Sequence, residues 1–393
     1  MPSSKHLSTI LHLLPNYEVG GEQQVLFGLL DAMADRPFRH IVVGVFEGPQ
    51  DFRPRLEAVS EKTYDINRNR APITQPKAFW RDVRHIGRTL MGIARDEQVR
   101  LVHGRTHDND LIAMLLGRKL GVPSVATHAG ARLFPDNRMT PSLRKTVRTM
   151  ALRRIVRSLD AIIAVGPDVR DNLIRTAKAP LDRIHLVRNA VARAERPEQS
   201  ERVMLRRRMD LPLDRALLVV VGRLIPAKGV DTLVEAMGLL DEIPATLLVI
   251  GDGPEREELE RMASGIPRER VRFLGIRDDV GDLLGAADLY LSASHSEGTS
   301  IALIEAMACA LPCAVADAPG LRDIVTDGEN GRIFQLRDSS DCSRVIAEAL
   351  AAPNEAEGWA TRAQQEVRRE FSMQTFVDRH CELYRALIEE DRG

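Results

Sequence analysis

Short apolar runs alternate with amphipathic stretches of helical length along the whole chain. Several of the short runs are continuously apolar instead of alternating, which is typical of parallel strands buried on both faces. The expected strands are 7–14, 41–46, 101–103, 124–127, 161–165, 184–187, 217–221, 246–250, 271–273, 289–292 and 312–316. Expected helices such as 22–34, 110–120, 230–240 and 301–310 lie between them. Repeated β–α units of this kind predict an α/β fold with open, doubly wound parallel sheets.

A polar stretch over 192–202 interrupts this alternation near the middle of the chain. Its composition (ARAERPEQSER) is typical of a linker. The segments on either side are similar in length, and both carry the β–α pattern. We therefore expect two Rossmann-like domains facing a cleft, one over 1–195 and one over 196–370. A break at Phe371-Ser372 precedes the last helical stretch, within 371–393.

The composition narrows the class of protein. Of the 393 residues 44% are hydrophobic, which is enough for sizeable cores. No apolar run reaches the roughly 18–20 residues of a membrane span. The run 7–14 predicts a first strand and not a signal peptide, because no small-residue cleavage site follows it. The four cysteines lack CxxC spacing and a histidine at zinc spacing, so we expect reduced, buried thiols in a cytoplasmic protein, with no metal site.

The net charge of −1 argues against nucleic acid as a partner, but it hides a division of charge along the chain. Residues 1–195 carry 31 Lys and Arg against 20 Asp and Glu, whereas the remainder carries 24 against 36. The basic half favours an anionic or membrane-associated partner, and attraction between the two domains is the alternative. Within that half, 140–160 predicts a basic amphipathic helix. This helix either lies on an anionic membrane or packs its apolar stripe into the domain.

Candidate chemistry begins where the expected strand 217–221 ends. Gly222 and Arg223 follow the strand, and Lys228 and Gly229 precede the next helix. An arginine, a lysine and a helix N-terminus at a strand end form an anion site of diphosphate size. The loop lacks the Gly-Lys-Ser/Thr order of a P-loop, and the chain contains no GxGxxG motif. The alternative is that both cations are ordinary solvated loop charges.

A second group of candidates lies in 294–305. Gly298 permits close approach of a ligand to the backbone, and Thr299 or Ser300 is suited to cap the helix that follows. Glu297 precedes that helix and Glu305 lies inside it, about 12 Å away at the helical rise. This separation exceeds the roughly 5–9.5 Å between paired glycosidase carboxylates. It suits the two ends of an elongated ligand such as a nucleotide sugar, or two acids stabilised by the helix dipole.

These motifs together resemble the retaining, GT-B-fold glycosyltransferases of family 4, also called glycosyl transferases group 1. The resemblance covers nearly the whole chain. It rests on VGRLIPAKG (221–229), the E-x7-E pair Glu297/Glu305, and EAMACALPCAVAD…GLRDIVTDGENG (305–331). IGDGPEREEL (250–259), FLGIRDDV (273–280) and the final helix break also match. In this family the last helix crosses back to the N-terminal domain, which is the acceptor side, while the C-terminal domain binds the donor.

The resemblance implies roles for the candidates of the C-terminal half. Arg223 and Lys228 would hold the donor diphosphate, and Glu305 would accept hydrogen bonds from the ribose hydroxyls. Glu297 would hold the transferred sugar. The amides around Ser300 and Ile301 would assist Glu297, and the segment at Ile276-Arg277 would line the base pocket.

In the N-terminal half, Gly20-Gly21 matches the family's glycine-rich loop near the donor phosphate and the acceptor. His128 matches a family histidine near the reacting face of the sugar, and His103 is an acceptor-side candidate. For either histidine the alternative is a purely structural role.

The sequence departs from the family pattern at three positions. Gln23 stands where an acid is expected after the glycine pair. Ala190 stands in place of the usual glycine of Asn-Gly-Val-Asp, and Gly166 replaces a common serine. None of these positions supplies a donor-diphosphate ligand, but the departures weaken any transfer of acceptor detail from relatives.

The implied reaction is retaining transfer of a hexose from UDP or GDP to a glycan, a lipid-linked acceptor or another hydroxyl group. No cofactor and no metal are expected, and cell-envelope or exopolysaccharide synthesis is the expected setting. The enzyme would lie in the cytoplasm or at the inner face of the membrane. The alternatives are a nucleotide-sugar epimerase of GT-B fold and a membrane-docked binding module without transfer activity.

Overall fold

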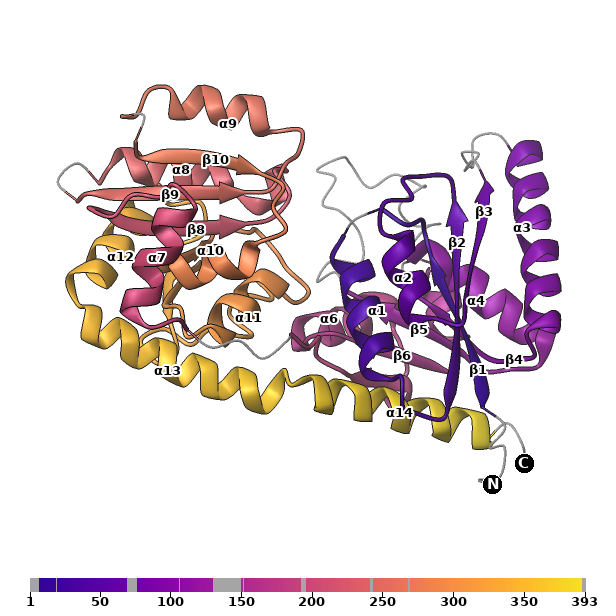
Figure 1. The fold of residues 1–393 in the computed structure, drawn as a ribbon. Coiled ribbons are helices and arrows are strands. Elements are labelled where there is room, and N and C mark those ends of the chain that lie inside the picture. Colours follow the sequence, from indigo (N-terminus) through magenta and orange to yellow (C-terminus); the bar gives the residue numbers. More distant parts are fainter. Residues whose placement is uncertain are drawn as a thin grey trace. The chain divides into compact units, whose positions relative to one another are not determined.

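The computed structural model describes residues 7–18, 20–68, 76–105, 107–129, 150, 152–191, 196–240, 243–267 and 269–390. These residues form two compact units (Figure 1). The N-terminal unit draws on Met1–Asn189 and Met373–Gly393, and the C-terminal unit on Ala190–Ser372. The boundaries lie a few residues from the expected ones at 195/196 and 370/371.

The N-terminal unit contains a seven-stranded sheet in which every strand pair is parallel. Its order is β3-β2-β1-β4-β5-β6-β7, so the direction of winding reverses between β1 and β4. The strands are β1 (Ser8–Leu14), β2 (Phe38–Phe46), β3 (Lys62–Arg68), β4 (Val99–Gly104), β5 (Ser124–His128), β6 (Ala161–Ala164) and β7 (Ile184–Leu186). The helical segments are α1 (Gly21–Ala32), α2 (Arg53–Val59), α3 (Pro76–Asp96), α4 (His107–Leu120), α6 (Pro167–Asn172), η1 (Leu173–Ala177), η2 (Leu181–Arg183) and α14 (Met373–Glu390).

The C-terminal unit contains a six-stranded parallel sheet of order β10-β9-β8-β11-β12-β13. The strands are β8 (Ala216–Val221), β9 (Ala245–Ile250), β10 (Val271–Gly275), β11 (Leu289–Ser292), β12 (Cys313–Ala316) and β13 (Arg332–Phe334). The helical segments are α7 (Gln199–Arg208), η3 (Pro226–Lys228), α8 (Val230–Gly238), α9 (Arg256–Ala263), α10 (Val280–Ala286), α11 (Ile301–Ala308), α12 (Ser339–Ala351) and α13 (Pro353–Glu370). The winding reverses between β8 and β11, and in open α/β sheets ligands bind at such a reversal.

Continuous apolar strands form the centre of both units. In β8, Leu217, Leu218 and Val219 are fully buried, because helices pack on both faces of the sheet. Burial of each such side chain contributes about 1.5–3 kcal/mol to folding. The prediction of an α/β fold with doubly wound parallel sheets is therefore confirmed.

The helix α14 packs against α1 and β4 of the N-terminal unit (Figure 1). Asp378 on this helix lies 2.7 Å from the guanidinium of Arg36. Arg379 donates a hydrogen bond to the carbonyl oxygen of Leu186 at the end of β7. Although α14 follows the whole C-terminal unit in sequence, it thus completes the N-terminal one.

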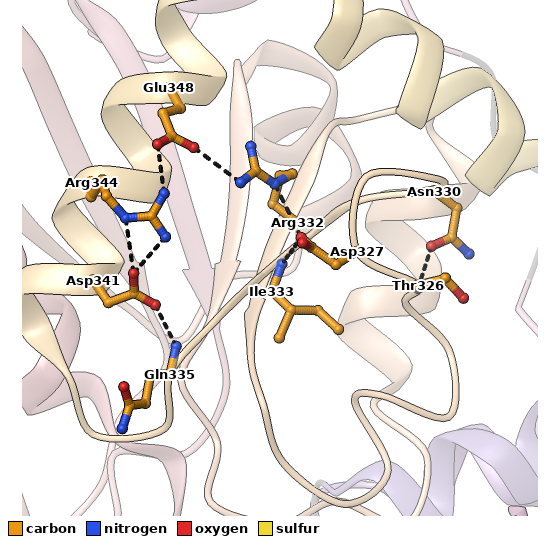
Figure 2. A network of polar contacts seen from close by, with 9 residues as sticks. All are labelled: Thr326, Asp327, Asn330, Arg332, Ile333, Gln335, Asp341, Arg344 and Glu348. Atoms are coloured by element: carbon orange, nitrogen blue, oxygen red, sulfur yellow. Dashed lines mark hydrogen bonds and ion pairs between the residues drawn. The ribbon is translucent and has the colours of Figure 1, made fainter.

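A ladder of alternating charges covers the edge strand β13 (Figure 2). The guanidinium of Arg332 lies 3.0 Å from Asp327 on one side and 3.0 Å from Glu348 on the other. Glu348 also pairs with Arg344, which continues the ladder to Asp341 along α12. An open sheet edge invites pairing with another strand, and charged side chains along it oppose such pairing.

Candidate functional site

The first predicted loop follows β8 and turns sharply into α8. Its last residue, Gly229, has a φ of +62° and begins the helix. A Cβ atom at this position would lie 2.3 Å from the carbonyl oxygen of Ala293, in the loop after β11. The turn therefore requires glycine for its conformation and for the close approach of the second loop.

A backbone hydrogen bond and an ion pair join the two loops. The amide of His295 donates to the carbonyl oxygen of Ala227 over 2.8 Å. The Nζ atom of Lys228 lies 2.5 Å from Oε1 of Glu297. Both side chains are largely enclosed, with 29% of Lys228 and 13% of Glu297 exposed. Lys228 is therefore held in an ion pair and is not a freely solvated loop charge.

Lys228 and Glu297 line a pocket in the C-terminal unit. The pocket is lined by Val220, Val221, Gly222, Leu224, Lys228, Val230, Val249, Ile250, Tyr290, Ser292, Ser294, Glu297 and Ser300. Three predicted site residues, Lys228, Glu297 and Ser300, thus lie together. Arg223 is exposed and does not line the pocket, although it belongs to the same loop.

Tyr290 is a pocket residue that the sequence analysis missed. It is almost completely buried in β11, and burial raises the pKa of its hydroxyl group well above the usual value. The hydroxyl group is hydrogen-bonded to Ser300, the residue before α11. Tyr290 therefore supports the start of the helix whose N-terminus faces the site. Its sequence context, an apolar strand, indicated only a core residue.

The remaining C-terminal candidates do not line this pocket. Gly298 is buried, Thr299 is half-buried, and Ile301 is the first residue of α11. Glu305 lies within α11, and its partial burial raises the pKa of its carboxyl group. Arg277 follows β10, where it is paired with Asp279 through two hydrogen bonds of 2.8 and 2.5 Å.

The neighbour of Arg277, Ile276, is one of the exposed large apolar side chains of the described chain. An exposed apolar side chain at a strand end is suited to stack on a flat ligand group. Sheet order places β10 at the edge beyond β9 and β8, so this segment and the pocket lie along the same end of the sheet.

In the N-terminal unit, Gly20 and Gly21 begin α1. Gly20 is the N-cap residue and has an extended backbone. Because glycine has no side chain, no side chain at this position caps the first amides of the helix. Gln23, in the first turn, is buried and donates a hydrogen bond of 3.3 Å to the carbonyl oxygen of Asn16. Where the family pattern has an acid, this chain thus has an amide that stabilises the preceding loop.

The two predicted histidines differ in their surroundings. His128 ends β5, and its Nε2 atom lies 3.2 Å from Oδ2 of Asp110 on α4. His103 is fully buried in β4, where its two ring nitrogens each lie 2.7 Å from a hydroxyl group, one of Tyr384 and one of Thr127. These contacts join β4, β5 and α14, and they favour the structural alternative for His103.

The predicted basic helix lies mostly outside the described residues, which include only 150 and 152–160 of its range 140–160. Within that part Met150 and Arg154 are exposed, whereas Arg153 donates a hydrogen bond to the carbonyl oxygen of Thr176. In the part of the chain that the structure describes, every helix is too short or too polar to cross a membrane.

Two family models and several characterised proteins match this chain in sequence. A family model described as Glycosyl transferases group 1 matches residues 204–366, and one described as Glycosyltransferase Family 4 matches residues 19–195. The alpha-maltose-1-phosphate synthase of Mycolicibacterium smegmatis is 28% identical over 309 residues, 74% of this chain and 79% of that protein. The alpha-D-kanosaminyltransferase of Streptomyces kanamyceticus is 26% identical over 283 residues, 70% of this chain and 73% of that protein.

Solved structures share the fold over the full length. The structure of HepE from Anabaena, in complex with UDP and glucose, has a TM-score of 0.81 to this chain at 19% identity. The match covers 97% of this chain and 100% of that one. The two parallel-sheet units therefore have the GT-B architecture.

Proposed function

The chain belongs to the glycosyltransferases of group 1, or family 4, and we propose that it transfers a hexose from a UDP- or GDP-linked donor to a hydroxyl acceptor with retention of configuration. The observation that carries this proposal is the pocket of the C-terminal unit, where Lys228 and Glu297 meet beside the N-terminus of α11. A nucleotide sugar places a diphosphate next to a hydroxyl-rich ring. The adjacent side chains match this order of groups, with Lys228 for the diphosphate and Glu297 for the hydroxyl groups of the ring.

The diphosphate would be held by Lys228 in the pocket, by Arg223 from the same loop and by the N-terminus of α8, the helix that follows them. Together they would neutralise the charge that develops on the leaving diphosphate, which is the largest requirement of the reaction. These groups belong to the chain itself, so we expect transfer to proceed without a metal ion or a cofactor.

The sugar end is supplied by Glu297 and by the amides at Ser300 and Ile301, which would hold the hydroxyl groups of the hexose. In the proposed reaction the bond between the anomeric carbon and the phosphate oxygen breaks. The acceptor oxygen bonds to the same face of that carbon, and its proton passes to the leaving diphosphate. His128 would stabilise the reacting face of the sugar, and Gly20-Gly21 would approach the phosphate and the acceptor.

The nucleoside end would extend from Glu305 towards the loop after β10. Glu305 would accept hydrogen bonds from the ribose hydroxyls, and Ile276-Arg277 would line the base pocket. The HepE structure, which holds UDP and glucose, supports a nucleotide sugar as the donor.

The acceptor is proposed from charge. The excess of Lys and Arg in residues 1–195 favours an anionic or lipid-linked glycan, as in cell-envelope or exopolysaccharide synthesis. We further propose that the enzyme works in the cytoplasm, with 140–160 in contact with an anionic membrane. Pelleting with vesicles of anionic phospholipid tests this contact. Charge reversal at Arg153 and Arg154 should abolish pelleting, and unchanged pelleting would contradict the proposal.

The transfer activity is tested with a panel of UDP- and GDP-hexoses, by following donor consumption and the anomeric configuration of the product by NMR. Glu305→Ala should raise the KM for the donor, whereas Glu297→Ala should chiefly lower kcat. Glu329→Ala, at an exposed position in the same unit, serves as the control. Wild-type kinetics in both site variants, or an epimerised donor formed without acceptor, would overturn the proposal.

A further inference from the structure

A third loop, the one after β12, reaches the site through Glu297. The amide of Glu297 donates a hydrogen bond of 2.9 Å to the carbonyl oxygen of Pro319. The next residue, Gly320, is buried and has a φ of +82°. A Cβ atom at this position would lie 2.1 Å from the carbonyl oxygen of Glu297 and 3.1 Å from its Cβ atom. The loop therefore touches both the amide and the carbonyl group of Glu297.

Glu297 is consequently held at three points. Its peptide groups lie against Pro319 and Gly320, and its carboxylate lies against Lys228 from the loop after β8. Strand order explains this arrangement, because β11 lies between β8 and β12 in the sheet. The loops that follow these three strands therefore meet at one end of the sheet, with the loop of Glu297 in the middle.

The loop after β12 is itself firmly anchored. The amide of Asp317 donates to the carbonyl oxygen of Phe334 on β13, and the amides of Leu321 and Arg322 both donate to the carbonyl oxygen of Ala318. A Cβ atom at Gly320 would collide with backbone atoms of Glu297. The turn that carries Gly320 is held in place by the hydrogen bonds just described, so it cannot easily move away. Either the turn or Glu297 would have to move to admit that atom.

We propose that Gly320 is a positioning residue of the transferase, because the absence of a side chain at this position fixes where the Glu297 carboxylate lies relative to Lys228. This inference rests on the proposed function, in which Glu297 holds the transferred sugar. Gly320 itself touches neither donor nor acceptor. Its effect on the reaction runs through the position of Glu297.

The test is Gly320→Ala, assayed for turnover of whichever nucleotide sugar the wild type consumes. A displacement of about 1 Å in a catalytic group costs roughly 10²-fold in rate, so kcat should fall by about that factor. The KM for the donor should change by less than roughly threefold, because the cations that bind the diphosphate keep their places. A purely structural role would instead lower the amount of folded enzyme and leave the kcat of the folded fraction unchanged.

Gly328→Ala is the matched control. Gly328 lies in the same unit with a similar φ of +73°, but a Cβ atom there has nothing within 4 Å. The conformational cost of alanine is therefore shared by both variants, and only Gly320→Ala adds the collision with Glu297. Gly328→Ala should keep the wild-type kcat.

A double-mutant cycle tests whether Gly320 acts through Glu297. In the Glu297→Ala background, Gly320→Ala should lower kcat by less than roughly threefold, because the carboxylate that it displaces is already absent. A full, additive loss in that background, or a wild-type kcat for Gly320→Ala alone, would overturn the inference.

If Gly320→Ala does not fold, Pro319→Gly tests the same contact by loosening the loop without adding an atom. It should lower kcat in the wild-type background and have little effect in the Glu297→Ala background, and a wild-type kcat would overturn the inference. These outcomes are distinct from failure of the proposed function, in which the wild-type chain itself turns over none of the nucleotide sugars.

Discussion

The Nε2 atom of His128 lies 3.2 Å from Oδ2 of Asp110, and both side chains are fully buried. A carboxylate at this distance restricts the orientation of the imidazole ring. The contact is formed between the end of β5 and the first turns of α4, two elements that pack on each other. Asp110 therefore orients the histidine that the proposed mechanism places at the sugar.

Replacement of Asp110 by asparagine tests this orientation. The amide keeps the shape of the side chain but removes its charge, so we expect kcat for donor turnover to fall by roughly tenfold or more. Asp160→Asn is the control, since Asp160 accepts hydrogen bonds from the amide and hydroxyl of Ser124 at the opposite end of β5. A wild-type kcat in Asp110→Asn would show that the orientation of His128 does not matter to turnover.

Replacement of Lys228 by alanine should weaken donor binding more than it weakens the fold. Lys228 is partly exposed, so loss of its ion pair should cost no more than about 1 kcal/mol of unfolding free energy. The Kd for UDP or GDP, measured by calorimetry, should rise by roughly tenfold or more because a phosphate-binding cation is lost.

Arg344→Ala is the control for Lys228→Ala. It also removes an ion-paired cation from the C-terminal unit, but from the ladder along α12 (Figure 2). Nucleotide affinity should stay at the wild-type value in this variant. Equal Kd values in wild type and Lys228→Ala would exclude Lys228 from the donor site.

Buried histidines should make the N-terminal unit less stable at mildly acidic pH. His12, His40, His103 and His380 lie around the buried guanidinium of Arg105, between β1, β2, β4 and α14. Burial lowers the pKa of all four, to about 4 for His40 and about 3 for His380.

The sign of this effect follows from the direction of the pKa shifts. Below pH 6.5 the unfolded chain binds protons that these histidines do not bind in the folded state. The stability that they contribute is therefore complete above pH 6.5 and is lost as the pH falls. Each histidine contributes up to about 1.4 kcal/mol per pH unit to this loss.

Urea unfolding at pH 7 and at pH 5 measures this loss of unfolding free energy. In His380→Gln the difference in unfolding free energy between the two pH values should be smaller than in the wild type. Because ordinary carboxylates titrate below this interval, the change reports chiefly on histidines. An unfolding midpoint that does not change between pH 7 and pH 5 would contradict the prediction.

Arg332 should stabilise the edge of the C-terminal sheet. Its side chain is 19% exposed and bridges Asp327 and Glu348 (Figure 2). The guanidinium also lies 5.4 Å from the ring centroid of Trp359. Arg332→Ala should lower the unfolding free energy by about 1–2 kcal/mol in urea titrations, with nucleotide affinity unchanged. Arg261→Ala, which removes an exposed pair with Glu258, should change it by less than about 0.5 kcal/mol.

Most of the strands that the sequence predicted have apolar runs buried on both faces, as in β8 and β11. The half-buried edge strands β7 and β10 were also predicted, because their short runs are mostly apolar. Two strands were missed, β3 and β13, for a physical reason. Both lie at sheet edges, where one side of the strand has no neighbour and polar side chains are tolerated. Lys62 and Arg68 bound β3, and Arg332 begins β13, so neither has an apolar pattern.

The sequence by itself determined the α/β fold, the family and the two charged loops that follow β8 and β11, because local patterns of apolar and charged residues carry that information. The tertiary structure alone decided which residues meet. Lys228 and Glu297 are 69 positions apart, and they touch because β8 and β11 are neighbours in the sheet. In the same way, strand order brings Gly320 against Glu297, and α14 encloses His103. Such contacts depend on the order of strands, which no local pattern encodes.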